Sequence, residues 1–143
     1  SLPRKRGAAR VRLAIPKGAN KDSPLLLLAH GAGGSENMFF DALGLGRYVR
    51  EGLARGAIVV APRLSLMGGL DVEGLLDRLA AVRPFDRDRV WAVGHSMGAM
   101  RLLGATSRTE RPFAALAVLA GGSAQRKAEA LARKRRDTGP WNR

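Results

Sequence analysis

Residues 90–100 read VWAVGHSMGAM, an apolar run followed by a Gly-x-Ser-x-Gly motif and then by a second apolar stretch. The run before Gly94 has the composition of a buried strand, and the residues after Ser96 are typical of a helix. A serine at a sharp turn between strand and helix is exposed to substrate. Small residues are needed two positions before and after it, because the turn is crowded. Gly94 and Gly98 meet that need, so the stretch predicts a strand–turn–helix unit with Ser96 as a catalytic nucleophile.

The start of the predicted helix favours negative charge. Backbone N–H groups at a helix N-terminus have no partner within the helix, and the helix dipole attracts an anion there. The amide of Met97 is therefore the natural donor to the oxyanion that forms when a serine attacks a carbonyl carbon. The alternative interpretation of the motif is a tight Gly-Ser turn without catalysis.

A second motif, HGAGGSEN, occupies residues 30–37 and follows the apolar run LLLLA. Glycines allow backbone amides to point into a site without side chains that block the substrate. We expect one N–H, from Ala32 or Gly33, to join that of Met97 around the oxyanion. A phosphate-binding loop is a weaker alternative, because the third glycine of the dinucleotide fingerprint and the Gly-Lys-Ser/Thr of a P-loop are both missing. A plain strand-to-helix turn is the remaining alternative.

Both histidines of the sequence lie in these two motifs. His30 is expected to orient the glycine loop by hydrogen bonds rather than to act as a base. His95 is adjacent to Ser96, and adjacent residues at such a turn point apart. Either histidine could still serve as a substitute base for Ser96, because a serine hydroxyl needs a proton acceptor to attack at neutral pH.

The remaining pattern predicts an α/β fold, with apolar strands separated by amphipathic helices. Predicted strands cover residues 11–15, 25–30, 57–62, 90–94 and 115–121, the first of them an edge strand. Predicted helices cover roughly 36–54, a segment capped by Asp71 and ended by Pro84, and a segment from Ser96 to about Thr106. Strands without polar alternation are typical of a mostly parallel sheet with helices on both faces.

Composition narrows the class of protein. The chain has 143 residues, of which 45% are hydrophobic, enough for one globular domain. It has no cysteine, which excludes disulfides and thiolate metal sites, and neither a metal nor an organic cofactor is implied. The apolar runs are too short to span a bilayer, and no secretory segment opens the chain, so a cytoplasmic location is favoured.

The net charge of +13 is concentrated at the two ends of the chain. We expect a basic tail at 1–9, a folded core at 10–123 and a basic tail or helix at 124–143. Such ends could contact nucleic acid or an anionic membrane. Solvated tails are the favoured interpretation, because Trp141 is the only aromatic residue within the basic runs.

The motifs HGAGGSEN, PFDRDRV and GHSMGAM, over about residues 10–122, resemble the α/β-hydrolase superfamily. Within it they resemble the serine esterase branch around polyhydroxybutyrate depolymerases, feruloyl esterases and dienelactone hydrolases. The resemblance implies hydrolysis of a small-molecule carboxylic ester through an acyl-enzyme on Ser96, with an oxyanion hole from the Ala32/Gly33 region and Met97. It also implies that Met38 and Phe39 lie near the acyl pocket or under the glycine loop.

The chain departs from that family after residue 122. The family's acid and histidine follow later strands, and no histidine follows Ser96 here. We therefore expect a sheet that is incomplete at its C-terminal side and impaired activity of this exact chain. The alternative is a truncated fragment or non-catalytic remnant that acts as a binding module. A sheet without its last strands has an exposed edge, which predicts self-association into a homo-oligomer.

Overall fold

The computed structural model describes residues 10–106 and 113–119, together with residues 126, 129, 130 and 133. Most of both basic ends lies outside these residues. The elements follow one another as β1 (Val11–Ala14), β2 (Leu25–Ala29), α1 (Met38–Asp41), α2 (Gly46–Ala54), β3 (Ile58–Pro62), α3 (Val72–Val82), β4 (Val90–His95), α4 (Met97–Thr106) and β5 (Ala115–Leu119). In the described part of the chain, no helix has the length and apolarity needed to cross a membrane.

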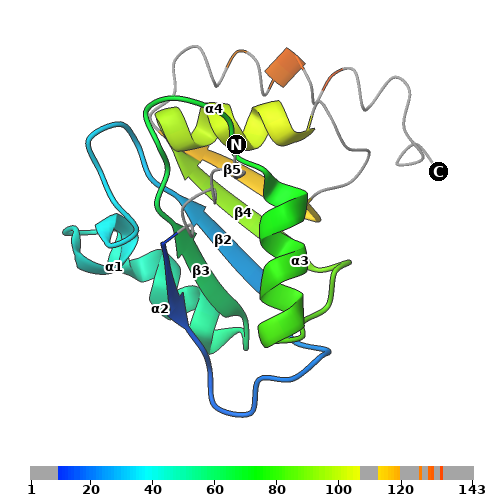
Figure 1. Cartoon of the computed structure of the whole chain (residues 1–143). Helices are drawn as coiled ribbons and strands as arrows, with labels where there is room; N and C mark the ends of the chain where they lie inside the picture. The colour runs from blue at the N-terminus through cyan, green and yellow to red at the C-terminus, as the bar shows by residue number, and fades with distance from the viewer. Residues whose placement is uncertain (1–9, 107–112, 120–125, 127–128, 131–132, 134–143) are drawn as a thin grey trace, which may run out of the picture.

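Five strands form one sheet in the order β1-β3-β2-β4-β5 (Figure 1). Strand β1 is antiparallel to β3 and lies at one edge, and the other neighbours are parallel. The predicted α/β class, the mostly parallel sheet and the first edge strand are therefore confirmed. Because the carboxyl ends of parallel strands meet at one edge, the segments after β2, β3 and β4 lie together, where open α/β sheets bind ligands.

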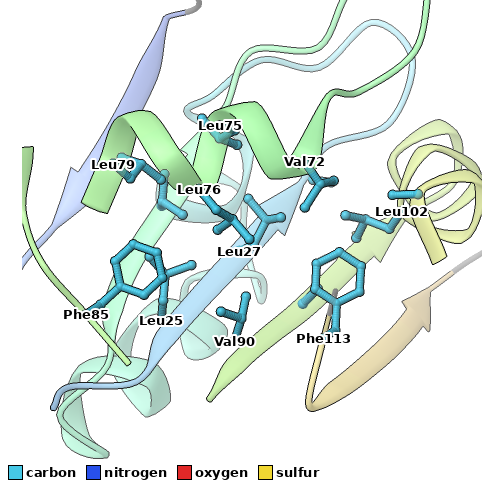
Figure 2. Close-up of a cluster of buried hydrophobic side chains, with 14 of the residues drawn as sticks. Leu25, Leu27, Val72, Leu75, Leu76, Leu79, Phe85, Val90, Leu102 and Phe113 are labelled. Atoms are coloured by element: carbon cyan, nitrogen blue, oxygen red, sulfur yellow. The ribbon is translucent and has the colours of Figure 1, made fainter. Parts of the chain in front are cut away.

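Helices cover both faces of the sheet, as predicted. Helix α3 crosses in front of the sheet in Figure 1, and Figure 2 shows Leu76 directed onto Leu27 of β2. Leu102 of α4 joins the same buried cluster. On the other face, Phe39 of α1 and Val49 of α2 pack against the alternate residues of β2 and β3. The all-apolar strands of the sequence are thus strands whose two faces are both covered.

The single helix predicted for residues 36–54 is wrong, because the chain forms two helices there. Ala42 leaves α1 with an extended backbone (φ −75°, ψ 137°), and Gly44 has φ +80°. A positive φ is incompatible with a continuous right-handed helix and is tolerated best by glycine. The break leaves Leu43 fully exposed, whereas the apolar periodicity of the segment places it on the buried face.

The aspartate-containing turn before β4 ties that strand to the start of β2. The Asp86 amide donates to the Ser23 carbonyl (2.8 Å), and the Leu25 amide donates to the Arg89 carbonyl (3.0 Å). The Arg89 side chain donates to the Asp86 carboxylate (2.9 Å), which also accepts from the Asp88 amide (2.9 Å). These two hydrogen bonds, with the charge of Arg89, lower the pKa of Asp86. The turn therefore fixes the register in which β2 and β4 begin.

Helix α4 begins unusually close to the sheet. A β-carbon on Gly98 would overlap the carbonyl oxygen of Ala29 and would lie 2.6 Å from that of His30. A β-carbon on Gly94 would lie 2.6 Å from the Cα and amide nitrogen of Ala99. Both neighbours are backbone, which cannot rotate away as a side chain could. Glycine is therefore required at both positions by the packing of β4, α4 and β2.

We predict that Gly98→Ala lowers the free energy of unfolding by about 2 kcal/mol or more, because the added methyl group must displace the backbone of β2. Gly46→Ala is the matched control. Its β-carbon would meet only the mobile end of Arg50 at 3.1 Å and the Phe40 carbonyl oxygen at 3.7 Å. The control should change stability by less than about 1 kcal/mol. Urea unfolding followed by circular dichroism measures both, and equal effects would contradict the prediction.

Candidate active site

Ser96 lies at the turn between β4 and α4 with a left-handed backbone. Its φ of 50° is the only positive value at a non-glycine residue among the residues the structure describes. Such a conformation costs on the order of 1–3 kcal/mol and persists only where the surrounding structure enforces it. Here the Ser96 amide donates to the Leu119 carbonyl of β5 (3.0 Å), and the Ser96 carbonyl accepts from the Met100 amide (3.2 Å). The residue is partly exposed, so its hydroxyl is not sealed in the core.

The first turn of α4 presents unpaired amides beside this serine. The amide of Met97 makes no backbone hydrogen bond to any other described residue. It belongs to the group of N-terminal helix amides that have no acceptor within the helix. An anion next to Ser96 could therefore accept a hydrogen bond from Met97 without breaking an existing one.

The glycine loop lies beside the same turn. A β-carbon on Gly31 would be 2.7 Å from Nδ1 of His95 and 3.4 Å from its carbonyl oxygen, and Ala29 pairs with Gly94 in the sheet. The Gly34 amide closes the loop on the Gly31 carbonyl (3.1 Å), and Gly33 has φ +77°. Ala32 and Gly33 are exposed, and within the described ranges their amides make no backbone hydrogen bond. The loop thus supplies a second set of free donors next to the serine turn.

His30 is buried, with only 2% of its surface exposed, and both its ring nitrogens are engaged. The Leu64 amide donates to Nε2 (2.8 Å), so Nε2 carries no proton. Nδ1 must then carry the proton and donate to the Gly31 carbonyl (2.7 Å). The imidazole therefore connects the glycine loop to the segment after β3, an arrangement suited to orienting the loop.

His95 is partly exposed, but its Nδ1 is buried against Gly31 and has no hydrogen-bond partner among the described residues. Over the same residues, no hydrogen bond joins the Ser96 hydroxyl to His95, His30 or a carboxylate. The structure thus brings Ser96, Met97 and the glycine loop together, and it places neither imidazole in hydrogen-bond contact with the hydroxyl.

Two supporting contacts of the site come from the segment after β3, which sequence reasoning missed. Leu64 acts through its backbone amide, so no side-chain signal could have identified it. Arg63 lies 3.6 Å from Glu36 of the HGAGGSEN motif, and this ion pair joins the same two segments a second time. Met38 lies under the loop, because its sulfur would be 3.1 Å from a β-carbon on Gly34. The described residues contain no group of three or more side chains placed to hold a metal ion.

Solved structures of similar fold are esterases and related hydrolases. An S-formylglutathione hydrolase from Agrobacterium tumefaciens is 17% identical, with a TM-score of 0.65 over 77% of this chain and 51% of that chain. An acetyl xylan esterase from Aspergillus awamori is 20% identical, with a TM-score of 0.63 over 82% and 48% of the two chains. An S-formylglutathione hydrolase from Staphylococcus aureus is 18% identical, with a TM-score of 0.60 over 74% and 48%.

The chain therefore spans about half the length of these solved structures, and the likeness concerns the fold. Comparison with curated proteins gives no significant match. The model of the alpha/beta hydrolase family matches residues 26–142, which is most of the chain. With this match and the sheet described above, the chain belongs to the alpha/beta hydrolase family.

Proposed function

We propose that this chain carries the nucleophile and oxyanion hole of a serine ester hydrolase, with Ser96 as the nucleophile. The observation that supports this most strongly is the backbone of Ser96, a non-glycine residue held at φ 50° between β4 and α4. Strain of this kind is found where a structure must present one side chain in a fixed orientation. Further support comes from the amides of Met97, Ala32 and Gly33, which make no backbone hydrogen bond to other described residues, and from the closeness of Gly31 to His95.

The reaction would proceed through an acyl-enzyme. The Ser96 oxygen attacks the ester carbonyl carbon, and its proton passes to a base and then to the alcohol, which leaves as the C–O bond breaks. The Met97 amide, with that of Ala32 or Gly33, stabilises the negative oxygen of the tetrahedral intermediate. Water then attacks the acyl-enzyme by the same route and releases the acid.

Among the residues that the structure describes, no base is in hydrogen-bond contact with the Ser96 hydroxyl. His30 has both nitrogens committed to the loop, and His95 makes no hydrogen bond to the hydroxyl within the described residues. The two are the only histidines of the sequence. We therefore expect slow acylation, because systems without triad members keep only about 10³- to 10⁴-fold acceleration over water. The same observation favours the second candidate function, a binding module that retains the site without turnover.

A fluorophosphonate probe separates these two functions. We predict slow, saturable labelling of the folded chain at Ser96, because the oxyanion hole also stabilises the phosphonyl oxygen during attack. Mass spectrometry of the labelled peptide locates the adduct, and Ser96→Ala is the control. If the folded chain takes up no label over many hours, the binding module is the better assignment.

We predict that His30→Leu lowers the free energy of unfolding by about 1–3 kcal/mol, since the Leu64 amide and the Gly31 carbonyl lose their buried partner. His95→Leu, at a histidine whose Nδ1 is unpaired in the described structure, should be close to neutral. Chemical denaturation measures both variants. A dominant role of His30 as a base would instead leave stability unchanged and abolish labelling of Ser96.

We also propose that the chain self-associates through β5, which forms an edge of the described sheet. Ala115 and Ala117 of this strand are exposed, and an edge strand offers unpaired backbone groups to another chain. Size-exclusion chromatography with light scattering should give a mass above the 15.3 kDa of one chain. A stable monomer at high micromolar concentration would overturn this proposal.

A further inference from the structure

A pocket of about 190 Å³ lies between the loop after β3, the start of α3 and the first turns of α4. Its apolar lining comes from Leu64, Leu70 and Leu75, and its cationic lining comes from Arg63, Arg78 and Arg101. The volume is smaller than the roughly 300 Å³ of the smallest typical small-molecule sites, so the pocket can hold one end of a ligand rather than all of it.

The lining carries a positive charge that the protein itself leaves largely unbalanced. Three arginines and one carboxylate, that of Asp71, belong to the lining. Glu36 lies outside the lining and pairs with Arg63 at 3.6 Å, so the charge left without a carboxylate partner among the described residues is that of Arg78 and Arg101. Asp71 already caps α3, because its Oδ1 accepts a hydrogen bond from the Gly74 amide (2.9 Å). Each guanidinium group carries a positive charge, so the arginines give the pocket a cationic character.

The acids of α3 do not neutralise these arginines. Glu73 and Asp77 both contact Arg87, at 2.7 and 3.2 Å, and Arg87 does not line the pocket. Arg78 has no hydrogen bond or ion pair with another residue of the described chain. Its guanidinium is therefore available to a ligand.

The other two arginines keep donors free as well. Arg101 uses one nitrogen to donate to the Leu66 carbonyl (3.0 Å), a contact that restricts its side chain. Arg63 lies 3.6 Å from Glu36, a distance too long for a strong hydrogen bond. Because each guanidinium has five donors, one fixed contact leaves a fork that matches the two oxygens of a carboxylate.

We propose that this pocket binds the carboxylate of a small aliphatic acid, with the anion on Arg78 and Arg101 and the hydrocarbon on the three leucines. The apolar lining favours an alkyl carboxylate over a bare inorganic anion, because the leucines would gain nothing from phosphate.

The pocket adjoins the proposed active site in two ways. Arg101 lies four residues after Met97 on α4, so the two share a face of the helix about 6 Å apart along its axis. Leu64 lines the pocket and also donates its amide to His30, which holds the glycine loop. An ester whose acyl group reacts at Ser96 could therefore place a free carboxylate in the pocket. The substrate class inferred here, an ester that carries a free carboxylate, rests on the proposed function. The binding of a carboxylate in the pocket does not depend on that function.

The test is an NMR titration of the full chain labelled with ¹⁵N, at constant ionic strength. Butyrate should produce saturable shifts of the Leu64, Leu70 and Arg101 amides, and butyramide, its neutral analogue, should bind at least about tenfold more weakly. Arg78→Gln and Arg101→Gln should each weaken butyrate about tenfold. The matched control is Arg50→Gln, an exposed position on α2 on the opposite face of the sheet, and it should bind as the unmodified chain does.

Several results of the titration would overturn the inference. They are equal binding of butyramide, unchanged binding in both pocket variants, or an equal loss in Arg50→Gln, which would indicate non-specific charge. Tighter binding of phosphate than of butyrate would overturn the carboxylate assignment. Labelling of Ser96 without butyrate binding would refute this inference alone, and butyrate binding without labelling would refute the proposed function alone.

Discussion

The first turn of α4 lies so close to the end of β2 that only a glycine fits at position 98. This contact sets the angle at which the chain leaves β4, and a chain that turns so sharply between strand and helix must pass through one residue with a left-handed backbone. Ser96 is that residue. The packing of Gly98 against the backbone of Ala29 and His30 holds this turn in place, and it also brings the glycine loop that follows His30 beside the turn.

His30 helps to hold the glycine loop beside the serine turn. A single neutral imidazole accepts from the segment after β3 and donates to the glycine loop, so that two backbone segments far apart in sequence share one rigid connection. The segment after β3 also lines the cationic pocket. The site and the pocket are thus built on the same backbone, and a displacement of the loop after β3 would reach both.

Much of the fold could be predicted because its signals are local. Apolar runs identified the strands, the capping carboxylate of Asp71 marked the start of α3, and the two glycines around Ser96 required a crowded turn. The break between α1 and α2 could not be predicted from periodicity, since the apolar positions continue across it and the helix is interrupted only by the backbone conformations of Ala42 and Gly44. The Leu64–His30 bond could not be predicted because its donor is a backbone amide that any residue would supply. The pocket could not be predicted either, because its arginines come from three separate segments that only the folded structure brings together.

The bond from the Ser96 amide to the Leu119 carbonyl has a consequence for biosynthesis. Strand β5 is synthesised after the serine. Until β5 pairs with β4, the Ser96 amide lacks its hydrogen bond to the Leu119 carbonyl. The turn that holds Ser96 is therefore complete only after the chain has grown past Leu119 and β5 has paired with β4.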